Sequence, residues 1–151
     1  MFSGPTKVTL DSKGRLAIPS RFRDLIAQRC QGHMVVTVDK SNCLLLYPQP
    51  DWEAVKAQLN ALPSLHEAAR ELQRHMVGGA NDVELDAAGR IRVSVEHREF
   101  AGLDKQVMLL GLGHKFEIWD HERWQRREGA WLKSKNPDFS DLPPELQTLS
   151  L

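Results

Sequence analysis

Short apolar stretches divide the chain into two halves with the same order of hydrophobic positions. Each half has an alternating segment, near 8–18 and 83–93, followed by two nearly continuous apolar runs, at 34–38 and 43–47 and at 107–112 and 115–119. Such short runs are typical of strands, the continuous ones of buried strands. A segment with helical spacing then follows, with Trp52 or Trp124 near its start. Each half is therefore predicted to run strand, turn, strand, helix, strand, turn, strand, helix.

The alternating segments contain one motif written twice, "LDSKGRLAIPSRFR" at 10–23 and "LDAAGRIRVSVEHR" at 85–98. Both place Asp four residues before Arg, with Gly directly before the Arg. A three-residue loop made of a type I turn and a left-handed Gly has this spacing, because Gly reaches that conformation without steric cost. Asp11 and Arg15 are then predicted to face each other across the turn at Gly14. The second copy has Asp86, Gly89 and Arg90 in the same places.

Extending this register outward predicts two closed hairpins. In the first, Leu10 faces Leu16, Thr9 faces Ala17 and Val8 faces Ile18. In the second, Glu84 faces Arg92 as an opposite-charge pair. A lone two-stranded hairpin is marginal in water, so something must cover its apolar face. We therefore expect an interleaved β arrangement, with strands supplied by the other copy in the chain or by another chain, and self-association.

A linker and a tail flank the repeats. The predicted boundaries are a first module at 5–54, linker helices at 55–77, a second module at 78–132 and a tail at 133–151. The stretch "PSLHEAARELQRHM" has Ser64 three residues before Glu67, which predicts a capping box, with an apolar stripe at Leu65, Ala68, Leu72 and Met76. The tail is rich in Pro, and its apolar residues could dock on a neighbouring subunit: Phe139, Leu142, Leu146, Leu149 and Leu151.

The formal net charge of zero conceals an asymmetry between the two copies. Residues 1–30 have six basic and two acidic side chains, whereas 82–104 have three basic and six acidic ones. Basic side chains on a projecting hairpin suit phosphate contact and insertion into a groove. The predicted DNA-binding residues are Lys7, Lys13, Arg15, Arg21, Arg23, Arg90 and Arg92. For the two Asp residues, closing the turn is the simpler role.

Other constellations favour packing over chemistry. The histidines form no i, i+4 pair and no HExxH, and no GxSxG or phosphate-binding loop is present. We expect no enzyme activity, metal, cofactor or small-molecule substrate. Cys30 and Cys43 are expected to be small core residues. Trp52 with Val55, Leu59 and Leu62, and Trp124 with Trp131, are interpreted as core or intersubunit packing, and Tyr47 and Trp119 as core or rim residues. No segment resembles a signal peptide or a membrane helix, which predicts a soluble intracellular chain with no membrane partner.

"MFSG" at the start, "LDSKGRLAIPSRFR" and the second "LDAAGR" together resemble the MraZ family, from Met1 to about Leu132. The resemblance implies an α+β fold of two AbrB-like swapped-hairpin β-barrel modules with flanking helices, related by a pseudo-twofold internal repeat. It also implies a bacterial transcriptional repressor of the division and cell-wall gene cluster, including its own gene, which binds direct repeats in double-stranded promoter DNA. Members form ring-shaped homo-oligomers of the octamer type and are found in cytoplasm and nucleoid.

In that family the DxxxR segments face DNA, which implies this role for Asp11, Lys13, Arg15, Asp86 and Arg90. The second copy departs from the pattern, with Ala87 and Ala88 where the first has Ser12 and Lys13. We therefore expect Arg90 to contribute less than Arg15. The alternative is an AbrB-like, antitoxin-type module whose main role is to bind a protein partner.

Overall fold

The computed structural model describes residues 1–134, 141–146 and 148. The first half of the chain comprises β1 (Phe2–Thr9), β2 (Arg15–Ala17), α1 (Ser20–Cys30), β3 (His33–Val38), β4 (Leu44–Pro48) and α2 (Gln49–Asn60). The second comprises β5 (Asn81–Glu84), β6 (Arg90–Arg92), α4 (Val95–Ala101), β7 (Gln106–Gly113), β8 (Phe116–Asp120) and α5 (His121–Lys133). Between them lie α3 (Glu67–Leu72) and the π-helical turn η1 (Gln73–Val77), and a short 3₁₀ turn, η3 (Pro144–Leu146), follows. The predicted order of elements is confirmed in both halves.

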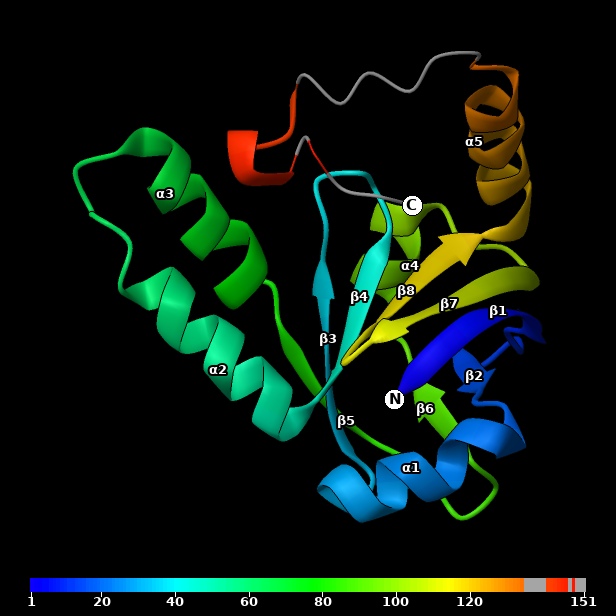
Figure 1. Ribbon diagram of the computed structural model, residues 1–151. Coiled ribbons are helices and arrows are strands. Elements are labelled where there is room, and N and C mark those ends of the chain that lie inside the picture. Colours follow the sequence, from blue (N-terminus) through cyan, green and yellow to red (C-terminus); the bar gives the residue numbers. More distant parts are fainter. Residues whose placement is uncertain (135–140, 147, 149–151) are drawn as a thin grey trace.

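Strands from both halves interleave in one six-stranded antiparallel sheet, in the order β1-β7-β8-β4-β3-β5, while β2 and β6 form a separate two-stranded ribbon (Figure 1). In the repeat, β1 corresponds to β5, β3 to β7 and β4 to β8. Replacing each strand by its counterpart gives the same sheet order read from the opposite edge. The topology therefore has the predicted internal repeat, in an α+β fold. The interleaving is achieved within a single chain.

The two predicted hairpins are correct at their turns and wrong beyond them. The backbone N–H of Asp11 donates to the carbonyl of Arg15 at 3.0 Å, and Leu10 forms a bridge with Leu16. Beyond that bridge the arms separate. Val8 pairs with Val107 in place of Ile18, and Ala17 lies opposite Arg90 in place of Thr9.

The second hairpin opens in the same way, so the predicted pair of Glu84 and Arg92 is also wrong. Glu84 lies opposite His33 on β3, and Arg92 lies opposite Arg15 on β2. A closed hairpin leaves its outer backbone groups and its apolar face without partners. Opening lets β1 and β5 extend the large sheet while β2 and β6 pair with each other.

The main core lies between the six-stranded sheet, the ribbon and helix α1. Leu16 of β2 and Ile91 of β6 are both fully buried in it. Phe2 of β1 packs against Phe22 of α1 and Phe116 of β8, with ring centroids 5.9 and 4.3 Å away. The ribbon is therefore held on its inner face by apolar packing, which leaves its outer face to other tasks.

Aromatic pairs attach α2 and α5 to equivalent places in the two halves. Tyr47 lies 5.6 Å from Trp52, and Trp119 lies 5.6 Å from Trp124. Tyr47, Trp52 and Trp119 are buried, as predicted, and so are both free cysteines. Trp131 is 70% exposed, so core packing within the chain was the wrong interpretation for that residue. Packing of Trp131 between subunits stays a prediction.

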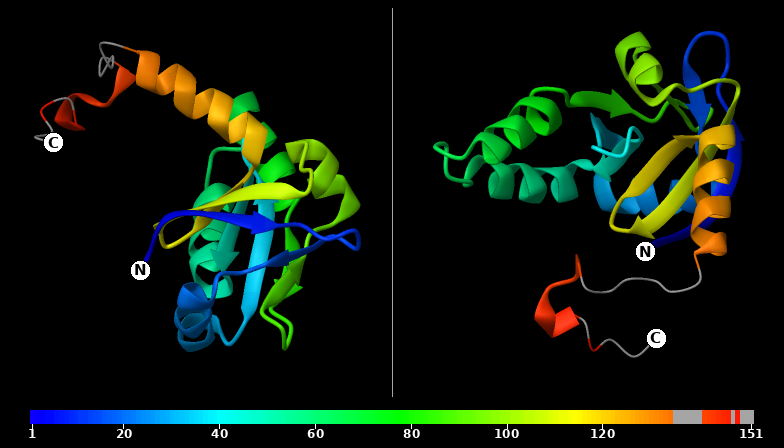
Figure 2. Two further views of the ribbon diagram at one scale, coloured as in Figure 1. Left: turned by 90° about the vertical axis from the view of Figure 1, so that its right-hand side faces the viewer. Right: turned by 90° about the horizontal axis from the view of Figure 1, so that it is seen from above.

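The linker forms helices that project with α2 away from the sheet (Figure 2). The predicted capping box is wrong: α3 begins at Glu67 after His66, and no side chain caps it. Leu65 is almost fully exposed, and the helix buries Ala69 instead of Ala68. In the tail, Phe139, Leu149 and Leu151 lie outside the described residues. The module boundaries stay predictions. None of the helices among the described residues has the length and hydrophobicity of a membrane span.

Candidate nucleic-acid interface

The first turn is organised by the carboxylate of Asp11. Its Oδ1 accepts hydrogen bonds from the backbone N–H groups of Lys13 and Arg15 at 2.9 and 2.8 Å, and its Oδ2 accepts one from Nε of Arg15 at 2.7 Å. Gly14 closes the turn at φ +80° and donates its N–H to the Asp11 carbonyl. The backbone N–H of Arg15 has the largest effect on the pKa of Asp11. Together with the Arg15 side chain and the N–H of Lys13 it outweighs desolvation and lowers that pKa from 3.8 to about 2.

The second turn repeats this geometry residue by residue. The Asp86 carboxylate accepts hydrogen bonds from the backbone N–H groups of Ala88 and Arg90 at 2.9 and 2.8 Å, and from Nε of Arg90 at 3.1 Å. Gly89 has φ +75°. The pKa of Asp86 is lowered, mainly by the backbone N–H of Arg90. Each Asp therefore closes a turn and fixes the Nε of the Arg that follows. The terminal guanidinium nitrogens of Arg15 and Arg90 have no protein hydrogen-bond partner within the described residues.

The ribbon joins the two turns and gathers their arginines on one face. Arg15 lies directly opposite Arg92, and Ala17 lies opposite Arg90. Leu16 and Ile91, between them, point into the core, so the four alternating positions point outward. We call this outer surface, made of Arg15, Ala17, Arg90 and Arg92, the ribbon face. The ribbon face carries three guanidinium groups, those of Arg15, Arg90 and Arg92, on two paired strands of three residues each.

Two cations directly opposite each other in a sheet destabilise it. Asp11 offsets the charge of Arg15, but Arg92 is exposed and has no acidic partner among the described residues. Such an arrangement is unfavourable in the free protein and becomes favourable when an anion lies across the ribbon face. Arg guanidinium groups bind phosphate oxygens through paired hydrogen bonds. The geometry therefore suits a polyanion better than a neutral ligand.

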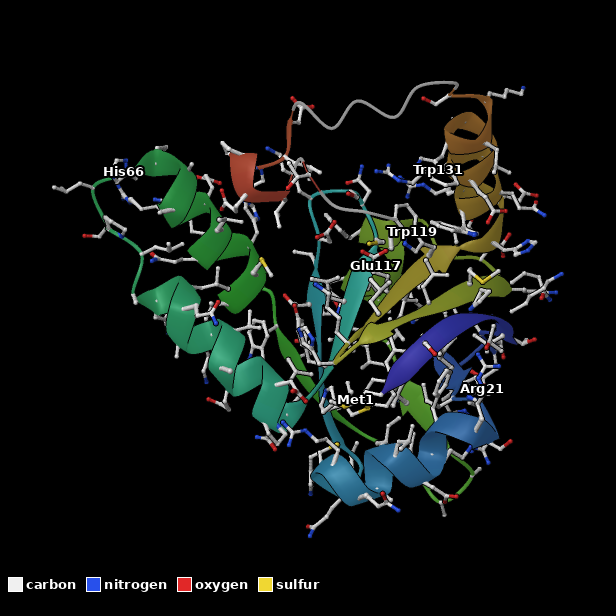
Figure 3. The ribbon with its side chains drawn as sticks, in the orientation of Figure 1. Met1, Arg21, His66, Glu117, Trp119 and Trp131 are labelled. Carbon is white, nitrogen blue, oxygen red and sulfur yellow. The ribbon has the colours of Figure 1, made fainter. Side chains whose placement is uncertain are left out.

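The other predicted DNA-binding residues lie at different distances from this face. Lys13 is exposed in the first turn, next to the ribbon. Arg21 is exposed at the start of α1, beside β1 and β2 in Figure 3, with its guanidinium 4.5 Å from the Phe22 ring centroid. Lys7 is exposed on β1, in the six-stranded sheet. Arg23 is half-buried against the second turn, with its Nε donating to the Ile18 carbonyl at 2.8 Å.

Arg98 was not among the predicted site residues, yet it lies against the first turn. Its Nε donates to the Val93 carbonyl at 3.1 Å, and its guanidinium faces Gly14. The repeat contained a signal for this residue, because Arg98 ends the second motif where Arg23 ends the first. Within the described residues, no group of three or more His, Cys, Asp or Glu could hold a metal ion.

Comparison with known proteins agrees with the two-part organisation. One family model, described as "MraZ protein, putative antitoxin-like", matches residues 1–75 and again residues 76–136. The transcriptional regulators MraZ of Nitrosomonas europaea and Nitrosospira multiformis are 50% and 48% identical to this chain, over the full length of each. The transcriptional regulator MraZ of Coxiella burnetii is 46% identical, also over the full length of both chains. The resemblance that the two motifs indicated is thereby confirmed, and the chain belongs to the MraZ family.

Proposed function

We propose that this chain is a DNA-binding transcriptional regulator that contacts double-stranded DNA through the ribbon face and the two turns beside it. The observation that carries the proposal is the pairing of Arg15 with Arg92, next to Arg90, on the outer side of a two-stranded ribbon. The relatives' name, transcriptional regulator, supports the same function.

The proposed contact uses the ribbon as a rigid carrier of positive charge. A two-stranded ribbon fits the major groove of B-form DNA, where side chains can reach base edges as well as the flanking phosphates. The Asp11 carboxylate fixes Nε of Arg15 while the two terminal nitrogens stay available for the ligand. Asp11 and Asp86 therefore orient the arginines and do not touch DNA. Lys13, Arg21 and Lys7 add phosphate contacts around the first turn.

The finer features belong to the same proposal. The regulator represses the division and cell-wall gene cluster, its own gene included, by binding direct repeats in the promoter. A ring-shaped homo-oligomer of the octamer type would hold several ribbons in fixed register, so that repeats of matching spacing are bound with avidity. The protein would act in the cytoplasm, associated with the nucleoid, without a cofactor or a small-molecule substrate.

The first experiment is footprinting of the purified full chain on the DNA upstream of its own gene, followed by gel shifts at several salt concentrations. We expect protected direct repeats and an affinity that falls steeply with salt, because phosphate contacts release counterions. The absence of protection upstream of the gene, at concentrations where the wild type is folded, would refute the proposal.

Arginine variants then locate the interface. Arg15→Ala should lose promoter binding, and Arg90→Ala should lose less of it, because the second turn has Ala87 and Ala88 beside Arg90. Arg126→Ala, on the exposed surface of α5, removes the same charge and serves as the matched control. Light scattering checks that all three variants keep the oligomeric state. Equal affinity of Arg15→Ala and wild type at moderate salt would rule out the ribbon face.

A second candidate function is binding of a protein partner by an antitoxin-type module. It is favoured by one observation: at the end of α5, Trp131, which is labelled in Figure 3, is 70% exposed, and Leu132 is 69% exposed. Deleting residues 136–151 in a chain that also carries Trp131→Ala and Leu132→Ala separates the two functions. A DNA-binding regulator keeps its promoter affinity after these changes, whereas a module that binds its partner through the end of α5 and the tail loses its partner.

A further inference from the structure

Each turn is bonded to the opposite half of the chain. The backbone N–H of Val93, which follows β6, donates to the carbonyl of Gly14 in the first turn at 2.8 Å. In the same way, the N–H of Ile18, which follows β2, donates to the carbonyl of Gly89 in the second turn at 2.9 Å. The conformation of each turn is therefore tied to a backbone segment that belongs to the other repeat.

An arginine fixes each of these two backbone segments. Nε of Arg98 donates to the carbonyl of Val93 at 3.1 Å, and Nε of Arg23 donates to the carbonyl of Ile18 at 2.8 Å. Arg98 thus holds Val93 through its carbonyl, and Val93 holds Gly14 through its backbone N–H, so that two hydrogen bonds separate Arg98 from the turn that carries Lys13 and Arg15. Arg23 holds the second turn through the equivalent pair of bonds.

The arginine side chains also occupy the space that the turn glycines leave open. A β-carbon at Gly14 would lie 2.9 Å from the Val93 carbonyl oxygen and 3.0 Å from Cζ of Arg98. At Gly89 a β-carbon would collide with Nε and Cζ of Arg23. Each Gly is therefore required twice, for its positive φ and for the guanidinium packed against it. The Gly that precedes Arg15 or Arg90 in each motif is therefore needed partly because an Arg of the opposite repeat packs against it.

We propose that Arg98 is a positioning residue for the first turn and Arg23 a positioning residue for the second, so that each repeat sets the geometry of the other repeat's DNA-contacting turn. The consequence for DNA rests on the proposed function, whereas the coupling between the turns does not. Arg98 orders Lys13 and Arg15 without touching the ligand, and it supplies the first turn with a cation from an otherwise acidic half of the chain.

Amide hydrogen exchange of the full chain tests the coupling directly. In Arg98→Gln, exchange at Gly14, Arg15 and Val93 should become about tenfold faster, the effect of one lost hydrogen bond, while Gly89, Arg90 and Ile18 keep their rates. Arg23→Gln should show the reverse pattern, and Arg126→Gln, the control, should change neither turn. This crossing from one repeat to the other distinguishes positioning from a general loss of stability, which would accelerate exchange at both turns together.

Gel shifts on the upstream DNA provide the second measurement. Arg98→Gln should weaken binding with an unchanged salt dependence, because no phosphate contact is removed. Arg15→Gln, by contrast, should reduce the slope of log affinity against log salt by about 0.9, the value for one phosphate. A loss of slope in Arg98→Gln would mean that Arg98 contacts DNA itself and would overturn its positioning role.

The two proposals can fail separately. If Arg98→Gln and Arg23→Gln show the crossed exchange patterns but the wild type binds no DNA, the positioning role is supported and the proposed function is refuted. Unchanged exchange at the first turn in Arg98→Gln, or equal acceleration at both turns, would overturn the positioning role even if the protein protects its promoter. A normal exchange pattern in Arg98→Lys, which keeps a cationic hydrogen-bond donor at this position, would further support it.

Discussion

Replacing Arg92 by Gln should stabilise the free protein while weakening its binding to DNA. Arg92 lies directly opposite Arg15 on the ribbon face, is exposed, and has no acidic partner within the described residues. Gln removes the positive charge and keeps most of the side-chain length. The substitution therefore relieves repulsion across the ribbon and leaves the buried pair of Leu16 and Ile91 untouched.

The magnitude follows from Coulomb's law. Directly opposite residues have Cα atoms about 4.5–5.5 Å apart, and their long side chains can spread until the charges are roughly 8 Å apart. Two unit charges at that distance in water repel each other by about 0.5 kcal/mol. Asp11, paired with Arg15 at 2.7 Å, offsets part of this repulsion. The expected gain in unfolding free energy is therefore at most of that size, or up to about 1–2 °C in Tm for a chain of this length.

Thermal unfolding of wild type, Arg92→Gln and Arg92→Lys at low and high salt is the appropriate assay. The Lys variant keeps the charge and should match the wild type in Tm. The gain of the Gln variant should be largest at low salt and vanish near 0.5 M, where the screening length falls to roughly 4 Å. In gel shifts Arg92→Gln should bind DNA more weakly than the wild type. The slope of log affinity against log salt should also be smaller by about 0.9, the value for one phosphate contact.

Two results would refute this reasoning. If Arg92→Gln is less stable than wild type at low salt, Arg92 contributes packing that outweighs its repulsion of Arg15. If its stability gain persists unchanged at high salt, the gain does not come from charge.

Three further predictions concern the turn and the core. Because the pKa of Asp11 is about 2 in the folded chain, the contribution of its carboxylate to stability is complete above pH 3.8 and is lost as the pH falls toward 2. The urea midpoint of Asp11→Asn should therefore decline less between pH 4 and 2 than that of the wild type, and an equal decline would contradict this. Gly111→Ala places a β-carbon 2.7 Å from the Ser3 nitrogen and should cost about 1–3 kcal/mol in urea unfolding, whereas Gly129→Ala, in open space on α5, should gain up to about 1 kcal/mol. Leu16→Ala, which empties a fully buried position under the ribbon, should lower the unfolding free energy by about 2–5 kcal/mol, and a loss below 1 kcal/mol would show that the ribbon is not held by this packing.

The site residues divide by how local their surroundings are. Asp11, Gly14 and Arg15 could be placed from the sequence, because a turn of this length closes through bonds between residues two to four positions apart. Arg23 and Arg98 could not, because the turn glycines they pack against, Gly89 and Gly14, lie in the other half of the chain, although the carbonyls to which they donate are only five residues away. A basic residue near a basic motif predicts a DNA contact, and only the fold shows that Arg23 lies against Gly89.

By itself the sequence determined the internal repeat, the order of strands and helices, the two glycine turns and the membership of the MraZ family. These follow from short-range spacing, which every compatible fold must satisfy. Tertiary structure decided which strands pair. The alternation of Val8, Leu10, Leu16 and Ile18 is equally compatible with a closed hairpin and with two open arms. The open form is selected because it lets β1 and β5 pair in the large sheet and brings Leu16 against Ile91 in one core. That choice also sets Arg15 opposite Arg92, and with it the charge of the ribbon face.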